Sequence, residues 1–278
     1  MTASTEFPMY PFVRAKSYTS GRKPGQPSVV FIHTTEGSEG TPSAENGAAY
    51  DQRRTDGTST HFFVDQDSTI QCVLVRDEAH AARSHGNDVG IQIEVCGRAG
   101  QTAAQWADAA SAGAIEQCAR LIVEIRNKYG AARFPLVNLT PAQLRAGQHG
   151  FAEHLDATKA WPEDGGTHWD PGPNFPWATV FARVKKLEAA EMRTLVWQAV
   201  EGKLPIIKFG DQDGEYANSG TSWVRRIQRQ LEIDVDGDYG NATVAAVKAL
   251  GINDGKTVDM RVWEKLFGLW GASDALKG

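Results

Sequence analysis

The sequence has 278 residues, 41% of them hydrophobic and 23% charged, which is the composition of an ordinary globular protein of one or two domains. Its formal net charge of −5 and the lack of a basic region exclude nucleic acid as an expected partner. Its three cysteines, Cys72, Cys96 and Cys118, show no CxxC spacing, which excludes a disulfide framework and a cysteine zinc finger.

The N-terminal residues lack the charged start and apolar core of a signal peptide, and no run approaches 18 apolar residues. We therefore expect synthesis in the cytoplasm, no signal peptide and no stable association with a membrane.

Short, apolar, β-branched runs predict four strands in the first part of the chain. These strands cover residues 28–33, 61–66, 69–74 and 90–95, and the middle two form a hairpin. A helix is predicted between the first two strands, with Ser43 as its N-cap.

The strongest helix signal covers residues 102–129, where Thr102 and Gln105 form a capping-box pattern and Gly130 follows the last turn. A further helix is predicted over residues 177–192. Strands interleaved with helices indicate an α/β fold in which helices flank a central mixed sheet.

The pattern changes after this helix. Residues 193–203 are expected to form a helical connector, and residues 204–278 a small module of three helices. Three groups of apolar residues mark these helices: Val224, Ile227 and Leu231; Val244 and Val247; Trp263 and Leu266. The expected domains are therefore 1–192 and 204–278.

Polar side chains of the types that bind metals occur near the ends of predicted elements. His33 closes the first strand, Glu94 lies near the end of another, and His154 precedes Asp170. Two histidines and one carboxylate, with a fourth position open to water, are a common catalytic zinc set. Spacing alone does not establish that they converge, and a histidine at a strand end is often purely structural.

Five motifs occur in a specific order: "VVFIHTTEG", "STHFFVDQDSTI", "VGIQIEVCG", "HLDATKAW" and "HWDPGPNFPW". Together they resemble the zinc-dependent N-acetylmuramoyl-L-alanine amidases of the type-2 class, whose fold is shared with peptidoglycan-recognition proteins. The likeness covers about residues 25–190 and is greatest to phage endolysins that act on actinobacteria.

This resemblance implies a Zn²⁺ ion held by His33, His154 and Asp170, with His149 as the rival for the second ligand position. It implies Glu94 as the general base, from "QIEVCG" laid over the family pattern "GIELxG", in which Gln92 replaces a glycine. His168 stands where many relatives have a lysine that stabilises the oxyanion. The expected substrate-binding residues are Thr60, His61, His80 and Asn87.

The C-terminal module resembles the three-helix peptidoglycan-binding domain found beside cell-wall hydrolases. The matching residues expected to act in wall binding are Asp236, Gly237, Tyr239 and Gly240. A helical dimerisation or packing domain is the alternative interpretation of this module.

The resemblance implies a monomeric endolysin that cuts the bond between N-acetylmuramic acid and L-alanine in peptidoglycan. Such an enzyme accumulates in the host cytoplasm and reaches the periplasm and cell wall through a holin-made lesion. Two alternatives stay open: a non-catalytic peptidoglycan receptor on the same fold, and a cytoplasmic muropeptide-recycling amidase.

Overall fold

The computed structural model describes residues 2–4, 6–23, 25–200, 206–213, 223–231 and 233–266. The chain forms two compact units, Met1–Ile122 with Arg133–Val184, and Val123–Ala132 with Lys185–Gly278.

The first unit is built on a seven-stranded sheet with the order β1-β2-β5-β4-β6-β3-β7. The strands are β1 (Thr2–Ala3), β2 (Pro11–Phe12), β3 (Val29–Thr34), β4 (Phe62–Val64), β5 (Thr69–Gln71), β6 (Gly90–Val95) and β7 (Gly150–Glu153). Strand β3 lies between β6 and β7 and is parallel to both, whereas β4 and β5 form an antiparallel hairpin. The expected mixed sheet is therefore confirmed.

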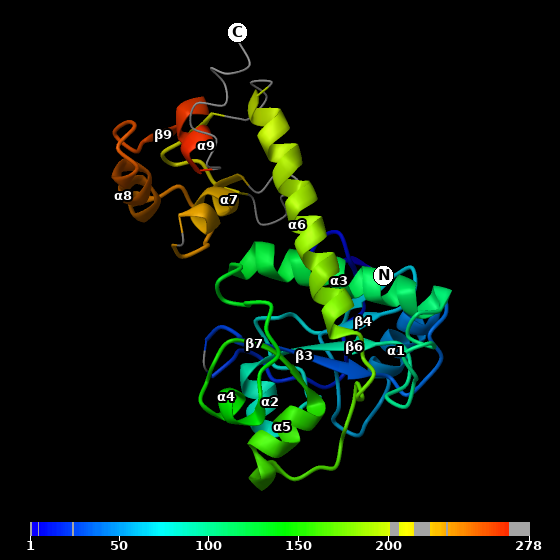
Figure 1. Ribbon diagram of the computed structural model, residues 1–278. Helices are drawn as coiled ribbons and strands as arrows, with labels where there is room; N and C mark the ends of the chain where they lie inside the picture. The colour runs from blue at the N-terminus through cyan, green and yellow to red at the C-terminus, as the bar shows by residue number, and fades with distance from the viewer. Residues whose placement is uncertain are drawn as a thin grey trace. The chain divides into compact units, whose positions relative to one another are not determined.

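Helices cover both faces of this sheet (Figure 1). They are α1 (Ser43–Asp51), α2 (Arg83–Val89), α3 (Ala109–Tyr129), α4 (Pro141–Arg145), α5 (His154–Ala160) and α6 (Trp177–Val200). Helices α2, α4 and α5 lie on one face, where Val29 and Phe31 share a core cluster with Ala157 and Trp161. The alternate residues of β3 point to the other face, which α3 covers.

Two predicted helix starts are wrong. Helix α1 has Pro42 at its N-cap position, without a side-chain cap, and Ser43 is already its first helical residue. Thr102 and Gln105 do form their reciprocal bonds, but these close a separate turn. Helix α3 starts only at Ala109, because the Asp108 side chain accepts a hydrogen bond from Ser111 N at 2.9 Å and caps the helix there.

The described residues from 206 to 266 contain three short helices, at the places where the apolar pattern predicted them. They are α7 (Trp223–Gln230), α8 (Asn241–Ala249) and α9 (Met260–Leu266), beside a two-stranded sheet of β8 (Ile207–Lys208) and β9 (Thr257–Val258). The core of the second unit includes Ile227, Tyr239, Val247 and Trp263. Helix α6 continues to Val200, so most of the predicted connector 193–203 is helical; residues 201–203 lie outside the described ranges.

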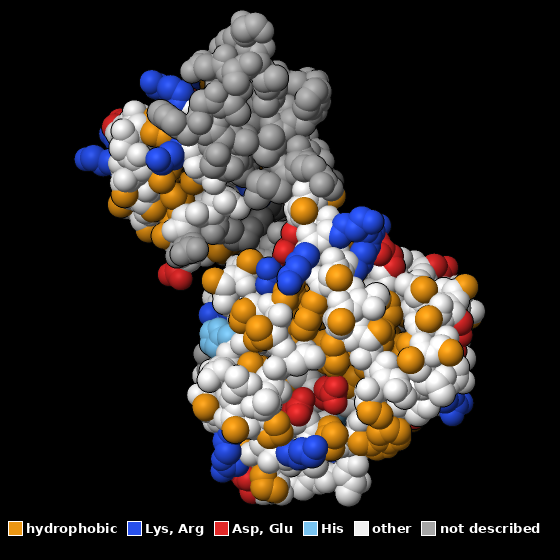
Figure 2. Space-filling view, viewed as in Figure 1, with side chains coloured by type: hydrophobic (Ala, Val, Ile, Leu, Met, Phe, Trp, Pro, Cys, Tyr) orange, Lys and Arg blue, Asp and Glu red, His pale blue; other side chains and the backbone are white. Residues whose placement is uncertain are grey.

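The surface is mixed in character. On the face drawn in Figure 2, basic side chains of the described residues form small groups beside acidic and hydrophobic ones, without a continuous basic stripe. Within the described ranges, no helix combines the length and apolar character needed to cross a membrane.

Candidate metal centre

Three side chains predicted as metal ligands meet in the first unit. His33 Nδ1 lies 3.2 Å from His154 Nδ1 and 3.0 Å from Asp170 Oδ2, and His154 Nδ1 lies 3.3 Å from Asp170 Oδ1. All three residues are buried. His149, the rival second ligand, is exposed and does not belong to this cluster.

Each of the three comes from a different element. His33 lies near the C-terminal end of strand β3. His154 is the first residue of α5, which Glu153 and Asp156 begin with a capping box directly after β7. The backbone then joins two of the candidates, because His154 N donates a hydrogen bond to Asp170 O at 3.1 Å.

The segment after Asp170 is fixed by a neighbouring loop. Gly172 has φ +88°, and a Cβ atom at this position would lie 2.0 Å from Ala99 O, so only glycine fits. Asn174 Nδ2 donates to Gln101 O at 3.0 Å, and Phe175 packs edge-on against Trp106. These contacts explain the "DPGPNFP" sequence: the chain is held where the Asp170 carboxylate enters the cluster.

Burial and mutual contact shift all three pKa values. Burial lowers the pKa of His154 to about 4, so this imidazole is neutral at pH 7. Burial is the largest single effect on His33 and lowers its pKa, but the hydrogen bond to Asp170, the charges of Asp170 and Glu94 and the hydrogen bond to Gln92 together outweigh it and raise the pKa to about 9. Burial raises the pKa of Asp170, yet its bonds to both histidines hold it well below the usual range. Asp170 is therefore an anion, and His33 carries a proton that a metal ion would displace.

The geometry fits a zinc ion. Zinc binds nitrogen at about 2.0–2.1 Å in a tetrahedral arrangement, which places its ligand atoms about 3.3 Å apart. His33 Nδ1 lies 3.2 Å from His154 Nδ1 and 3.0 Å from Asp170 Oδ2, and both separations are close to the edge of such a tetrahedron. The separation of 3.3 Å joins His154 Nδ1 to the other carboxylate oxygen, Oδ1. Two nitrogens and one carboxylate oxygen are also a donor set that zinc accepts, and three protein ligands leave one position open.

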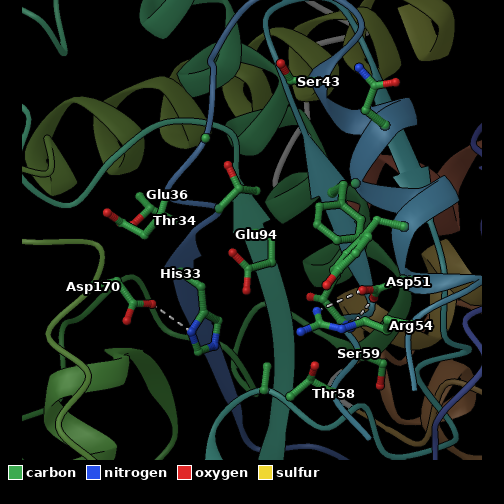
Figure 3. A pocket seen from close by; sticks show the side chains of 18 of the residues that line it. His33, Thr34, Glu36, Ser43, Asp51, Arg54, Thr58, Ser59, Glu94 and Asp170 are labelled. Carbon is green, nitrogen blue, oxygen red and sulfur yellow. Dashed lines mark hydrogen bonds and ion pairs between the residues drawn. The ribbon is translucent and has the colours of Figure 1, made fainter. Parts of the chain in front are cut away.

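Glu94 lies beside the cluster. It is the register partner of His33 on β6, and its carboxylate points into the same cavity (Figure 3). Its Oε2 atom is buried and has no hydrogen-bond partner among the described residues. Burial raises the pKa of Glu94 to about 7; the charge of His33 opposes this shift and that of Asp170 adds to it. A carboxyl with this pKa can accept or donate a proton at neutral pH.

His168 lies on the solvent side of the cluster. Its side chain is 52% exposed, and its ring stacks on that of His154 with centroids 4.3 Å apart and planes 2° apart. His168 Nδ1 lies 3.8 Å from Asp170 Oδ1. The ring is thus held in place by stacking while one edge stays open to a bound molecule.

The cluster forms one end of a cavity of about 530 Å³. Tyr50, Asp51 and Arg54 line another part of it, and Figure 3 shows Arg54 across the cavity from His33. Arg54 pairs with Asp51 at 3.3 Å and with Asp56 at 2.7 Å. Burial raises the pKa of Asp51 to about 6. The sequence did not identify this charged group. Its residues lie at the end of α1 and directly after it, where polar residues are typical of an ordinary solvent-exposed surface.

The four predicted substrate-binding residues fall into two groups. Thr60 and His80 line the cavity, whereas His61 and Asn87 do not. His61 is fully buried, and its Nδ1 accepts a hydrogen bond from Gln92 N at 2.9 Å. Asn87 Oδ1 accepts bonds from the backbone of Ala81 and Ala82. The positions of His61 and Asn87 correct that expectation, since both hold the fold together away from the cavity.

The residues predicted for wall binding are engaged within the second unit. Asp236 Oδ1 accepts from Asp238 N at 2.8 Å, and Gly237 N donates to Gln228 Oε1 at 2.9 Å. Tyr239 is buried and its hydroxyl donates to Gly255 O at 2.7 Å, while Gly240 is the N-cap residue of α8. This motif shapes the module; the Tyr239 side chain is buried within it, whereas Asp236 is exposed.

Comparisons with known proteins give a family match and structural neighbours. Residues 23–173 match the sequence profile of a family described as N-acetylmuramoyl-L-alanine amidase. No curated protein matches the chain.

Two solved structures illustrate the structural similarity. The Staphylococcus aureus hydrolase AmiA, in complex with its ligand, aligns with 16% identity over 66% of this chain and 86% of that chain, with a TM-score of 0.50. The endolysin amidase LysCS from Clostridium intestinale aligns with 16% identity over 66% of this chain and 99% of that chain, with a TM-score of 0.42. At such identities the AmiA alignment supports the fold alone.

Proposed function

The chain belongs to the N-acetylmuramoyl-L-alanine amidase family, because the family profile matches residues 23–173, more than half of the sequence. On this premise we propose that it is a zinc-dependent peptidoglycan amidase that acts as a phage endolysin. The bond cut would join the lactyl group of N-acetylmuramic acid to L-alanine of the stem peptide.

The observation that supports this proposal is the meeting of four side chains in one cavity. His33, His154 and Asp170 each offer one donor atom, and these atoms lie within 4.8 Å of one another, while Glu94 is the register partner of His33. A receptor that only binds peptidoglycan would not need a complete ligand set beside a carboxyl with a pKa near neutrality.

A bound zinc ion would polarise the scissile carbonyl and lower the pKa of a water molecule. Glu94 takes a proton from the attacking water and later delivers it to the departing amine of L-alanine. Its pKa is about 7 in the metal-free protein, and a cation held by His33 would lower it, so the carboxyl would be ionised and able to accept the first proton at neutral pH.

His168 is proposed to stabilise the developing negative charge on the carbonyl oxygen. Its exposed edge can donate a hydrogen bond, and its stacking on His154 keeps the ring in one orientation. Thr60 and His80 are proposed to contact the substrate, since both line the cavity.

The second unit is proposed to hold the enzyme on the cell wall, which raises its local concentration at an insoluble substrate. In this proposal the protein is a monomer that accumulates in the host cytoplasm and reaches the wall after a holin opens the membrane. Asp236, which is exposed, is proposed to contact the wall, whereas the buried Tyr239 supports the fold of the module.

Digestion of purified peptidoglycan tests the reaction. Mass spectrometry should detect new L-alanine amino termini with the native protein and none with chelated protein or Glu94→Ala. Release of reducing sugars would instead identify a glycosidase. Binding of the native protein to the wall without any cleavage would favour a receptor.

A further inference from the structure

A buried glutamine contacts one of the proposed zinc ligands. Gln92 is fully buried in the middle of β6, where the family pattern "GIELxG" has a glycine. Its register partner is Phe31, two residues before His33, so the side chains of Gln92 and His33 lie on the same face of the sheet. Gln92 Oε1 lies 2.9 Å from His33 Nε2.

The orientation of this amide is fixed by its second partner. Gln92 Nε2 lies 3.0 Å from Gly86 O, and a carbonyl oxygen can only accept, so the NH₂ group must face it. Glycine at position 90 leaves space for this bond, because a Cβ atom there would lie 2.5 Å from Gln92 Nε2. The amide oxygen is therefore the atom that faces His33.

This orientation determines which nitrogen of His33 carries a proton. Because Gln92 Oε1 can only accept a hydrogen bond, His33 Nε2 must carry the hydrogen that is donated. The other ring nitrogen, Nδ1, then offers a lone pair to a metal ion once any proton on it is displaced. Nδ1 is the atom that faces His154 and Asp170. A ring with its proton on Nδ1 could not bind a metal at this point.

We infer that Gln92 is a positioning residue, which holds the His33 ring and selects the tautomer that binds the metal. The inference rests on the proposed zinc dependence. Hydrogen-bond partners of metal ligands commonly contribute about 10- to 100-fold to metal affinity, because they orient the ligand and fix its tautomer.

Zinc affinity, measured by competition with a chromophoric chelator in the absence of substrate, tests this role. Gln92→Met fills a similar volume without an acceptor and should weaken zinc binding by about 10- to 100-fold. Gln92→Glu keeps an oxygen acceptor for His33 Nε2 and should restore affinity to within a few-fold of the native protein. Native affinity in Gln92→Met would overturn the inference.

Gln71→Met is the matched control. Gln71 is also fully buried in a strand, and it accepts from the Ser4 hydroxyl and donates to Val73 O at 3.1 Å. It is not one of the cavity-lining residues, so its replacement should lower thermal stability and leave zinc affinity unchanged. Equal losses of zinc affinity in Gln71→Met and Gln92→Met would indicate a general effect on stability and overturn the inference.

A measurement on the native protein does not depend on how the variants fold. Nitrogen-15 NMR of the zinc-loaded protein should show that the His33 ring carries its hydrogen on Nε2. Hydrogen on Nδ1 would refute the inference. Neither the chelator competition nor the NMR measurement uses peptidoglycan. If the protein failed to cleave cell walls, that result would therefore refute the proposed reaction and leave the role of Gln92 standing.

Discussion

His33 and Glu94 are register partners on the adjacent parallel strands β3 and β6, and both side chains enter the same cavity (Figure 3). A cation held by His33 would therefore lie close to a buried carboxyl. Because a positive charge favours the ionised form, metal binding would lower the pKa of Glu94 from its value of about 7. The carboxyl is then available as a base at neutral pH.

Replacing Glu94 with glutamine should reduce kcat by about 10²- to 10⁴-fold, the usual contribution of a general acid or base. Zinc affinity should stay near the native value, because Glu94 is not one of the three clustered donors. Turnover of a soluble muropeptide and a chelator competition would measure the two quantities separately. A variant with near-native kcat would remove Glu94 from the mechanism.

The same variant should change how the stability of the metal-free protein depends on pH. The pKa of Glu94 is about 7 in the folded state against an ordinary 4.5, so the folded protein binds more protons between these values. Stability then falls as pH rises through this window. Metal-free Glu94→Gln should be more stable than the native protein at pH 8, by on the order of 1–3 kcal/mol, and no more stable at pH 4. Urea unfolding at both pH values would test this; a gain at pH 4 would point to packing instead.

The parts of the fold that sequence predicted are those with a local signal. Strand β3 begins with four consecutive apolar residues, β6 alternates apolar and polar residues, and α3 carries a long apolar stripe. Strand β7 has four residues and α5 has seven, so neither is long enough to show the hydrophobic periodicity of a strand or of a helix. His154 could therefore be proposed from its motif but not from the element that positions it.

Sequence could not decide which neighbouring side chains face the cavity. Thr60 and His61 are adjacent, yet Thr60 lines the cavity while His61 is buried away from it. Adjacent residues in an extended chain point to opposite sides, so a motif without its register leaves the choice open. The contact of Gln92 with His33 likewise depends on register, since the two residues come from different strands.

Gly172→Ala should distort the segment that presents Asp170. The new Cβ would lie 2.0 Å from Ala99 O at a φ of +88°, so the backbone must move. We expect a loss of about 2–4 kcal/mol of stability together with weaker zinc binding. Gly165→Ala is the control, because φ is also positive there but nothing lies within 4 Å of the added atom. Zinc affinity that falls equally in both variants would contradict this explanation.

Gln228 should be the polar residue on which the second unit most depends. It is buried, its Nε2 donates to Asp238 O at 3.0 Å, and its Oε1 accepts from Gly237 N. Gln228→Met would leave these backbone groups without their partner, at a cost of about 2–4 kcal/mol. Retention on insoluble cell walls should fall while zinc affinity stays unchanged. Gln230→Met, at an exposed position of the same helix, should retain native wall binding; if it loses binding equally, the loss does not come from Gln228.

Zinc binding should release a proton from His33. In the metal-free protein the pKa of His33 is about 9 and that of His154 about 4, so at pH 6 only His33 among the two rings is charged. Since a ligand nitrogen must be deprotonated, binding at pH 6 should release about one proton from His33. Glu94, whose pKa of about 7 a bound cation would lower, should release a further fraction, so affinity should rise by at least about tenfold per pH unit.

Calorimetry in two buffers of different ionisation enthalpy measures this proton release directly. Asp170→Asn is the informative variant, because the Asp170 carboxylate is the main reason that the pKa of His33 is raised. It should bind zinc more weakly yet release a smaller fraction of a proton at pH 6, since burial without the carboxylate favours neutral His33. Release that is absent in the native protein, or unchanged in Asp170→Asn, would mean that Asp170 does not hold a proton on His33 before the metal arrives.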